Sequence, residues 1–460
     1  MAIFGKNADT SLRNFILIAI FIGVLMFIVI ILLLSSGDYL VFKYIGAIIE
    51  NLWWVIFPIP LWYGFLIAWG EYTELMFIRK HDNVLLEIRP PSDTEKSPKV
   101  MEQIFAGLHT FSAINKFEKY CGWRPLQEKF TFEIASVEGV VHFYIRCLWV
   151  SRDLVESLIY AQYPDAEIFE AEDYTKQVPK VLPNKDWDVW GTALRLHKDD
   201  SVPIRTYRSF KEDVTGQMID PLSSLTEIMS TFSKDEHLWL QFVFTPQPEL
   251  DWENLGKAKI EEITGQIDTV SFSAIGDVFN NIIKDVFGNI FSVITKGETA
   301  FNDLAEELEE EERDFNINQL TPGQQEMLRA IEENISKESF VVTGRMVYVG
   351  DRSVFNKARG VAGGFGTLKQ FADLTLNSLV PDNRTKTFAL YHFTESRMAY
   401  RQRKIIQDYR NRAFAGTTFS MSIEELATIY HFPDMSVTTP AIQKIQAKKG
   451  DAPFNLPISA

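Results

Sequence analysis

The side chains best suited to bind a ligand gather in one basic segment near the C-terminal end of the chain, residues 397–412. Six cations lie there, with Tyr400 and Tyr409 between them: Arg397, Arg401, Arg403, Lys404, Arg410 and Arg412. Arg397, Arg401 and Lys404 recur at helical spacing and therefore share one face of a predicted helix. Cations interleaved with aromatic rings can contact nucleic-acid phosphates or an acidic protein surface. The alternative interpretation is a charged helix that only faces solvent.

The known catalytic signatures are missing from the sequence. It contains no GxxxxGK[ST] phosphate-binding loop, no HExxH, no CxxC pair and no GxSxG. The glycine-rich stretch 360–366 lacks a lysine and a hydroxyl in register, so we expect close packing within a helix rather than a phosphate cradle. We therefore predict no enzymatic activity for the chain itself, no cofactor and no metal.

Two smaller groups of polar residues have alternative interpretations. Glu170, Glu172 and Asp173 cluster at the end of a predicted strand, where a solvated turn is favoured over a carboxylate metal site. His142 and His392 lie in predicted strands, and we expect structural roles for both.

A second candidate contact surface lies in a predicted helical insertion, residues 247–337. Apolar residues at helical spacing form one face there: Val278, Phe279, Ile282, Ile283, Val286, Phe287, Ile290 and Phe291. An acidic run follows at 303–314. The apolar face either packs on its own domain or forms an arm that contacts a partner. Lys284 is outweighed by Asp277 and Asp285 on the polar face, which favours a partner protein over anionic lipid.

Composition places the chain among folded proteins. The 460 residues are 46% hydrophobic, which excludes a disordered tail, and the net charge of −15 excludes a surface that is basic all over. Cys121 and Cys147 do not make a disulfide framework, which fits a reducing compartment.

Two apolar stretches near the N-terminus predict a membrane anchor within residues 1–80. Phe15 to Leu34 has the length of a bilayer-spanning helix, and residues 52–69 form a second stretch without charge. Lys6 and Arg13 precede the first stretch, and more cations follow the second than lie between the two. This bias predicts two transmembrane helices in a bacterial inner membrane, with both termini and the remaining domains in the cytoplasm.

Beyond the anchor, the hydrophobic period predicts the order βαββαβ twice, which is the ferredoxin-like arrangement. The first unit covers residues 83–180, with a Glu138-Gly139 turn in its central hairpin. The second covers 187–393 and contains the insertion; a helix from 351 to about 379 and a strand at 387–393 complete it. Residues 394–460 follow as a basic helix and a proline-containing tail. Two capping boxes mark predicted helix starts, Thr321 with Gln324 in the insertion and Ser422 with Glu425 in this tail. The predicted fold class is thus α+β: two transmembrane helices, then tandem ferredoxin-like units.

Four segments carry a resemblance to a known family. They are LLEIRPP (85–91), FEIASVEGVVHFYIR (132–146), VESLIYAQYPDAEIFEAEDY (155–174) and SIEELATIYHFPDMSVTTPAIQKIQAKKGDAPFNLP (422–457). Together they resemble the membrane-anchored N-terminal region of bacterial conjugation-type, type IV secretion-like ATPases. In that family a P-loop motor domain often follows the proline-containing stretch, whereas this chain stops at Ala460. No nucleotide-binding residue carries over, and the chain is either a stand-alone homologue with a separate motor or a truncated form.

The resemblance implies a non-enzymatic scaffold on the cytoplasmic face of a conjugation-like translocation system, which docks a motor ATPase or a substrate. The expected partners are the lipid bilayer, a P-loop motor ATPase or other translocation subunits, and a second copy of the chain. The alternative is a nucleic-acid-binding adaptor that uses the basic helix at 397–412.

Overall fold

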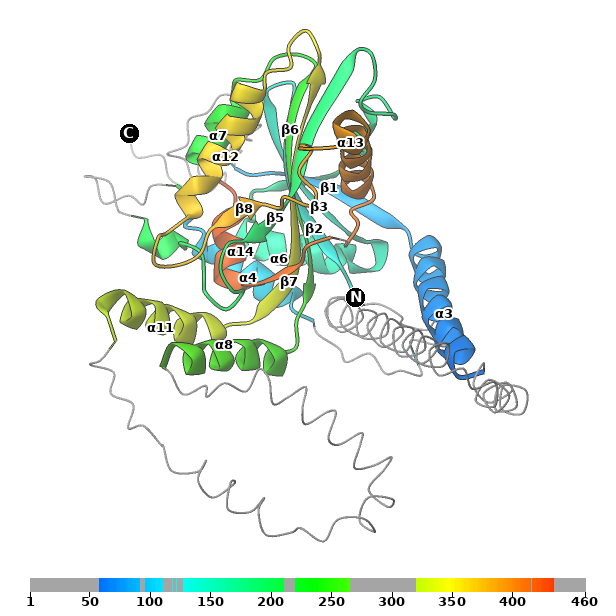
Figure 1. Ribbon diagram of the computed structural model, residues 1–460. Coiled ribbons are helices and arrows are strands. Elements are labelled where there is room, and N and C mark those ends of the chain that lie inside the picture. The colour runs from blue at the N-terminus through cyan, green and yellow to red at the C-terminus, as the bar shows by residue number, and fades with distance from the viewer. Residues whose placement is uncertain are drawn as a thin grey trace, which may run out of the picture.

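A nine-stranded antiparallel sheet forms the centre of the computed structural model (Figure 1). The structure describes residues 58–91, 96–110, 127–210, 220–264, 320–414 and 416–433, together with the isolated positions 118 and 121. Along the sheet the strands run β4-β1-β3-β2-β6-β7-β5-β8, and β9 pairs with β7.

The first half of the sheet comes from the N-terminal half of the described chain. Its elements are β1 (Asn83–Arg89), α4 (Lys99–Leu108), β2 (Phe130–Val137), β3 (Val140–Leu148), α6 (Arg152–Gln162) and β4 (Glu167–Glu170). The order β4-β1-β3-β2 is that of the split βαββαβ motif. Glu138 and Gly139 both have positive φ angles between β2 and β3, as the predicted hairpin turn requires.

The second half has the same strand order, read in the opposite direction along the sheet. Its elements are β5 (Trp187–Leu196), α7 (Ser223–Ser230), β6 (Glu236–Pro246), β7 (Ser339–Asp351), α12 (Gly364–Leu368) and β8 (Leu379–Pro381). A π-helical turn, Ala358–Gly363, precedes α12. The predicted helix at 351–379 is therefore too long. The predicted strand at 387–393 is wrong, because β8 precedes it and residues 387–393 form an irregular loop.

The two halves share a single sheet and core. β2 and β6 pair antiparallel from Phe130↔Phe244 to Val137↔His237. These two strands are the inner edges of the halves, and their hydrogen bonds join the halves into one sheet. One apolar cluster runs through both halves and includes Phe105, Phe132, Phe242 and Met346. The predicted fold class is corrected on this point: the two βαββαβ orders do not form tandem units but one α+β domain.

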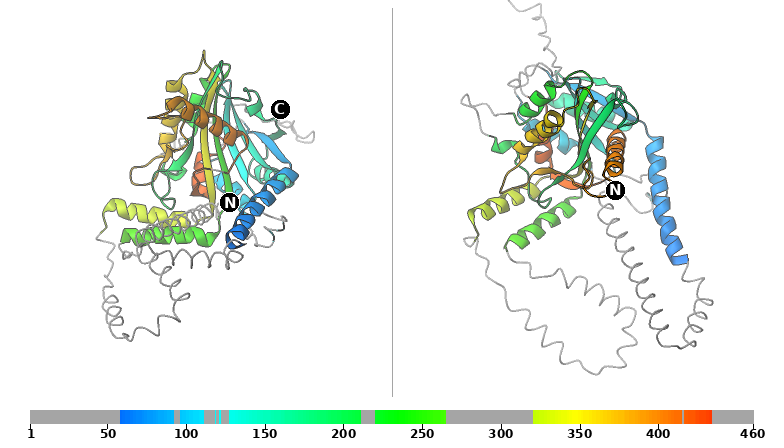
Figure 2. Two further views of the ribbon diagram at one scale, coloured as in Figure 1. Left: turned by 45° about the vertical axis from the view of Figure 1, so that its right-hand side comes forward. Right: turned by 45° about the horizontal axis from the view of Figure 1, so that its top comes forward.

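Helices cover the two faces of the sheet unequally. On one face, five helices pack on the sheet and enclose the larger apolar cluster: α4, α6, α7, α12 and α14 (Ile423–Ile429). On the other face, α13 (Thr394–Arg410) and residues 174–182 cover a smaller cluster. Figures 1 and 2 show α13 on the opposite side of the sheet from α7 and α12.

The segment after residue 393 belongs to the domain, although the sequence indicated a separate helix and tail. β9 (Phe419–Ser422) pairs with β7, and α14 packs against α4 of the first half. Ser422 and Glu425 form the predicted capping box at the start of α14. Residues 434–460 lie outside the described residues.

Two helices from the predicted insertion lie side by side beyond one end of the sheet (Figures 1 and 2). They are α8 (Glu249–Thr264) and α11 (Pro322–Ile335), and Thr321 and Gln324 form the predicted capping box of α11. A Cβ added to Gly256 would lie 2.2 Å from a methyl carbon of Ile335, so glycine permits the close approach of the two helices.

The described residues contain no helix that is long and apolar enough to cross a membrane. α3 (Pro58–Lys80) includes only part of the predicted second span, and its second half carries Glu71, Glu74 and Arg79. Within the described residues, this finding contradicts the predicted anchor and the inner-membrane location inferred from it. The predicted first span, Phe15 to Leu34, lies outside the described residues.

Candidate functional site

The basic segment forms α13, as its spacing predicts, and one side of this helix is buried. Gln402, Ile405, Ile406 and Tyr409 pack against the sheet. Gln402 donates to the backbone carbonyl of Val189 in β5 at 2.7 Å. α13 is therefore fixed on the sheet, and its cations divide into those that turn inward and those that face solvent.

A row of polar side chains crosses the sheet beneath the C-terminal end of α13. Tyr144, Glu133, Gln241 and Arg345 are successive register partners on β3, β2, β6 and β7. Gln241 donates to Glu133 at 2.8 Å, and Arg345 donates to Gln241 at 3.1 Å. The row spans the β2–β6 pairing, so these bonds join the two halves of the sheet. Glu133, Gln241 and Arg345 are buried.

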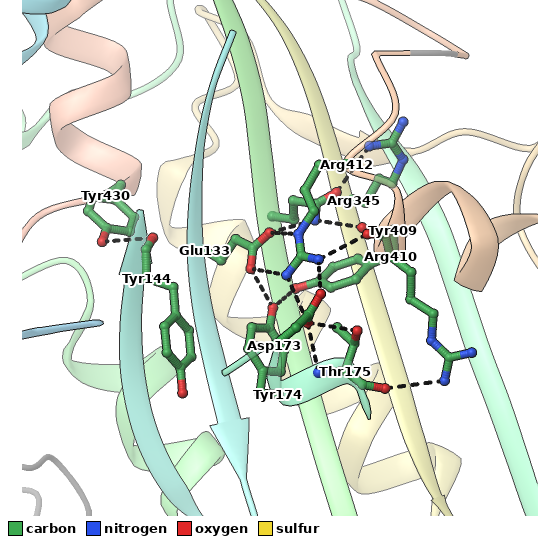
Figure 3. Close-up of polar contacts among 11 residues, drawn as sticks. Glu133, Tyr144, Asp173, Tyr174, Thr175, Arg345, Tyr409, Arg410, Arg412 and Tyr430 are labelled. Carbon is green, nitrogen blue, oxygen red and sulfur yellow. Dashed lines mark hydrogen bonds and ion pairs between the residues drawn. The ribbon is translucent and has the colours of Figure 1, made fainter. Parts of the chain in front are cut away.

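Arg412 supplies the counter-charge for this row (Figure 3). Its Nε and Nη2 atoms donate to the Glu133 carboxylate at 2.9 and 3.3 Å, and its Nη2 also donates to Asp173 at 3.1 Å. Nη1 completes the ion pair with Asp173. Arg412 follows the end of α13 with a φ of +47°, a left-handed conformation that L residues rarely adopt. This turn directs the guanidinium back toward the sheet.

Two tyrosines complete the network in Figure 3. Tyr174 donates to Glu133 at 2.8 Å, and the hydroxyls of Tyr174 and Tyr409 lie 2.6 Å apart. Burial raises the pKa of both tyrosines, and the nearby Glu133 charge raises it further. Burial alone would lower the pKa of Arg412, but the charge of Glu133 and the hydrogen bond to Asp173 raise it instead. The network therefore keeps Arg412 charged and both tyrosines protonated. Its role is structural: it fixes the C-terminal end of α13 to the sheet.

Arg410 is also used internally. Its guanidinium donates to the backbone carbonyls of Lys180, Thr175, Val178 and Pro179, the first at 2.6 Å and the others at 2.9–3.3 Å. Burial lowers its pKa. Arg410 and Arg412 thus attach the residues after β4 to α13. Both side chains are thus committed to contacts within the fold.

Two other arginines hold the loop that precedes α13. Arg401 donates to the carbonyls of Lys386 and Phe388, the first at 3.1 Å, and Arg397 donates to that of Leu390 at 3.3 Å. These bonds order a loop that presents large apolar side chains to solvent. Arg403 and Lys404 are exposed.

The exposed side chains around this loop form a surface whose cations and Tyr400 were predicted, whereas its loop residues were missed. We call it the α13 surface, and it consists of Phe388, Leu390, Tyr391, Phe393, Tyr400, Arg397, Arg403 and Lys404. Tyr391 and Phe393 are both 83% exposed, and both have left-handed φ angles, +69° and +56°. Such backbone conformations are costly for aromatic residues, and they concentrate at functional sites. The alternating apolar residues had indicated a strand here instead.

The other polar candidates divide into paired and exposed residues. Asp173 pairs with Arg412 as described, and Glu170 pairs with Arg152 at 3.2 Å. Within the part of the chain that the structure describes, no group of three or more acidic, histidine or cysteine residues is arranged to hold a metal. His142 lies 2.8 Å from the Glu87 carboxylate, whereas His392 is exposed in the loop rather than in a strand.

The glycine-rich stretch packs closely, as expected. A Cβ at Gly360 would lie 2.4 Å from the Tyr348 ring, so this turn rests directly on the sheet. The apolar face predicted at 278–291, from Val278 to Phe291, lies outside the described residues.

Comparison with known proteins connects the chain to one family. A family described as "Domain of unknown function (DUF8128)" matches residues 71–445, which include every described strand and the whole α13 surface. A search of curated proteins found no match to the chain.

Proposed function

This chain belongs to the DUF8128 family, and we propose that it is a non-catalytic docking component of a translocation system, which binds an acidic partner protein through the α13 surface. The translocation context rests on the resemblance to conjugation-type ATPases described above. The docking role rests on the α13 surface itself, and its exposed aromatic side chains carry the proposal.

The composition of the α13 surface favours a protein partner. Aromatic residues and arginine are enriched in protein interfaces and carry most of the binding free energy there. Tyr391 and Phe393 expose large rings that gain free energy when a partner buries them. Arg397, Arg403 and Lys404 beside them make the surface locally positive in a chain of net charge −15. A complementary partner therefore presents acidic and apolar groups.

The support behind the surface suits a docking role. Arg397 and Arg401 hold the loop through its backbone carbonyls, and the Arg412 network fixes the end of α13 to both halves of the sheet. A surface that is ordered before binding loses less entropy when the partner binds. This architecture favours a firm platform over an adaptable segment.

A nucleic-acid adaptor is the weaker candidate for this surface. Of the six cations in the basic segment, Arg410 and Arg412 are bonded to internal groups, and Arg401 is half-buried against backbone carbonyls. The remaining cations are few for phosphate contacts, which dominate the affinity of nucleic-acid binding.

Where a P-loop ATPase is encoded beside the gene for this chain, binding of the two purified proteins tests the proposal. Tyr391→Ser combined with Phe393→Ser should weaken the complex at least tenfold in biolayer interferometry, because both rings lose their buried area. Leu374→Ser is the matched control, since Leu374 is 99% exposed on another loop, and it should leave the affinity unchanged. Equal affinity of the double variant and the wild type would refute docking through this surface. Binding of single-stranded DNA that the double variant loses, without any ATPase binding, would establish the nucleic-acid alternative instead.

A further inference from the structure

A cavity of about 520 Å³ lies between the end of β5 and the helix pair α8 and α11. Arg195, His197 and Lys198 line it on the β5 side, and Lys259 and Ile263 line it from α8. Its volume is in the range of pockets that bind small molecules. The cavity shares no lining residue with the α13 surface, and the inference drawn from it does not rest on the proposed docking function.

The walls of this cavity are tightly packed. Trp252 of α8 is buried and donates to the carbonyl of Asn334 in α11 at 3.4 Å, and Asn334 donates to the carbonyl of Ser201 at 3.3 Å. Lys259 forms an ion pair with Asp199 at 2.6 Å, which joins α8 to the loop after β5. With the close α8–α11 approach at Gly256, these contacts indicate a cavity that exists before any ligand binds.

Two cations at the cavity have carbonyl partners rather than carboxylates. Arg195 donates to the carbonyl of Leu196 at 3.1 Å, and Lys198 donates to those of Leu374 and Thr375 at 3.1 and 2.7 Å. No ion pair joins Arg195 or Lys198 to an acid within the described ranges. Carbonyl groups orient a cation but leave its full charge in place, so an anion in the cavity gains from both.

The lining also offers an apolar floor. Leu196, Val202, Ile263 and Met327 contribute apolar atoms beside the cations. An inorganic anion would leave these apolar atoms exposed to water, whereas an organic anion would cover them.

We propose that this cavity binds a small phosphate monoester that carries an apolar group. A phosphate monoester has a charge of about −1.5 to −2 at neutral pH, which matches the two cations Arg195 and Lys198. The guanidinium fork of Arg195 suits phosphate oxygens geometrically. The apolar group of the ligand would rest on Ile263 and Met327, which are half-buried.

Isothermal titration calorimetry of the full chain tests this site with phenyl phosphate as the probe. One saturable site is expected, and inorganic phosphate should bind about tenfold more weakly because it leaves the apolar floor uncovered. Benzoate should also bind more weakly, since its single charge matches only one cation. Absence of saturable binding of phenyl phosphate at millimolar concentration, or tighter binding of benzoate, would overturn the proposal.

Two variants and one control locate the site. Arg195→Gln should weaken phenyl phosphate at least tenfold, because it removes a charged hydrogen-bond donor. Lys257→Gln is the control: Lys257 is on α8 as well, but it is 61% exposed, pairs with Glu253 and does not line the cavity. If circular dichroism shows that Arg195→Gln is unfolded, Lys198→Gln takes its place. An equal effect of the cavity variant and the control would show non-specific attraction and refute the site.

Discussion

Replacing Arg412 by methionine should destabilise the protein by about 3 kcal/mol. Methionine keeps much of the length of the side chain but removes the charge that faces Glu133 and Asp173. The side chain of Arg412 is 4% exposed and that of Glu133 is fully buried, so the orphaned carboxylate cannot recover its hydration. Removal of one partner from a buried ion pair costs about 3–5 kcal/mol.

Neighbouring groups place the expected loss of stability at the lower end of that range. The pKa of Arg146 is lowered by burial and by repulsion from Arg412, so loss of Arg412 relieves this cation. Tyr174 and Gln241 also continue to donate to Glu133. Asp173 is 27% exposed as a side chain, and water can replace part of its contact with Arg412.

Urea titration followed by circular dichroism and tryptophan fluorescence measures this effect as a change in the free energy of unfolding. Arg403→Met on the exposed side of α13 is the matched control and should change that free energy by less than about 0.5 kcal/mol. The double variant Glu133→Gln with Arg412→Met should cost less than the sum of the single variants, because the buried charge is then absent. A loss of less than about 1 kcal/mol in the free energy of unfolding for Arg412→Met would refute the stabilising role of Arg412. Strict additivity of the two single variants would refute it as well.

Two further predictions concern the core. Gly360→Ala should destabilise the protein by about 1–3 kcal/mol in urea titration, because its Cβ would collide with the Tyr348 ring; Gly366→Ala, with nothing within 4 Å, should not, and equal effects would contradict the packing argument. Burial lowers the pKa of His237 to about 4 from its usual 6.5, so the folded state favours the neutral ring. The associated stability is present above pH 6.5 and is lost as the pH falls toward 4, by an amount on the order of 3 kcal/mol. Urea titrations across this pH range should show a slope that His237→Asn reduces, and an unchanged slope would contradict the assignment.

Local patterns in the sequence predicted much of the sheet. Phe130, Phe132 and Ile134 alternate with polar residues, and β2 forms there with these three side chains in the larger core cluster. The capping boxes at Thr321 and Ser422 were also predicted, because each depends on residues only three positions apart. Such signals are local, and tertiary contacts reinforce them.

The candidate site depends on contacts that no local pattern reports. Alternation in β2 implies a solvent-facing Glu133, yet α13 covers that face and buries the carboxylate. The basic helix was predicted, but which of its cations turn inward depends on tertiary contacts. Arg410 meets the carbonyls that follow β4, and a left-handed turn directs Arg412 to the sheet. The loop around Tyr391 was assigned to a strand because aromatic and β-branched residues favour strands wherever packing does not decide.

The link between Glu133 and Arg412 joins positions 279 residues apart. Ribosomes deliver Glu133 early and its counter-ion only when most of the protein has been synthesised. Until then, the nascent first half exposes an edge at β2 that β6 has yet to cover, and it holds a carboxylate without its cation. Completion of this domain is therefore a late event in translation, and long-range closure of this kind makes folding slow.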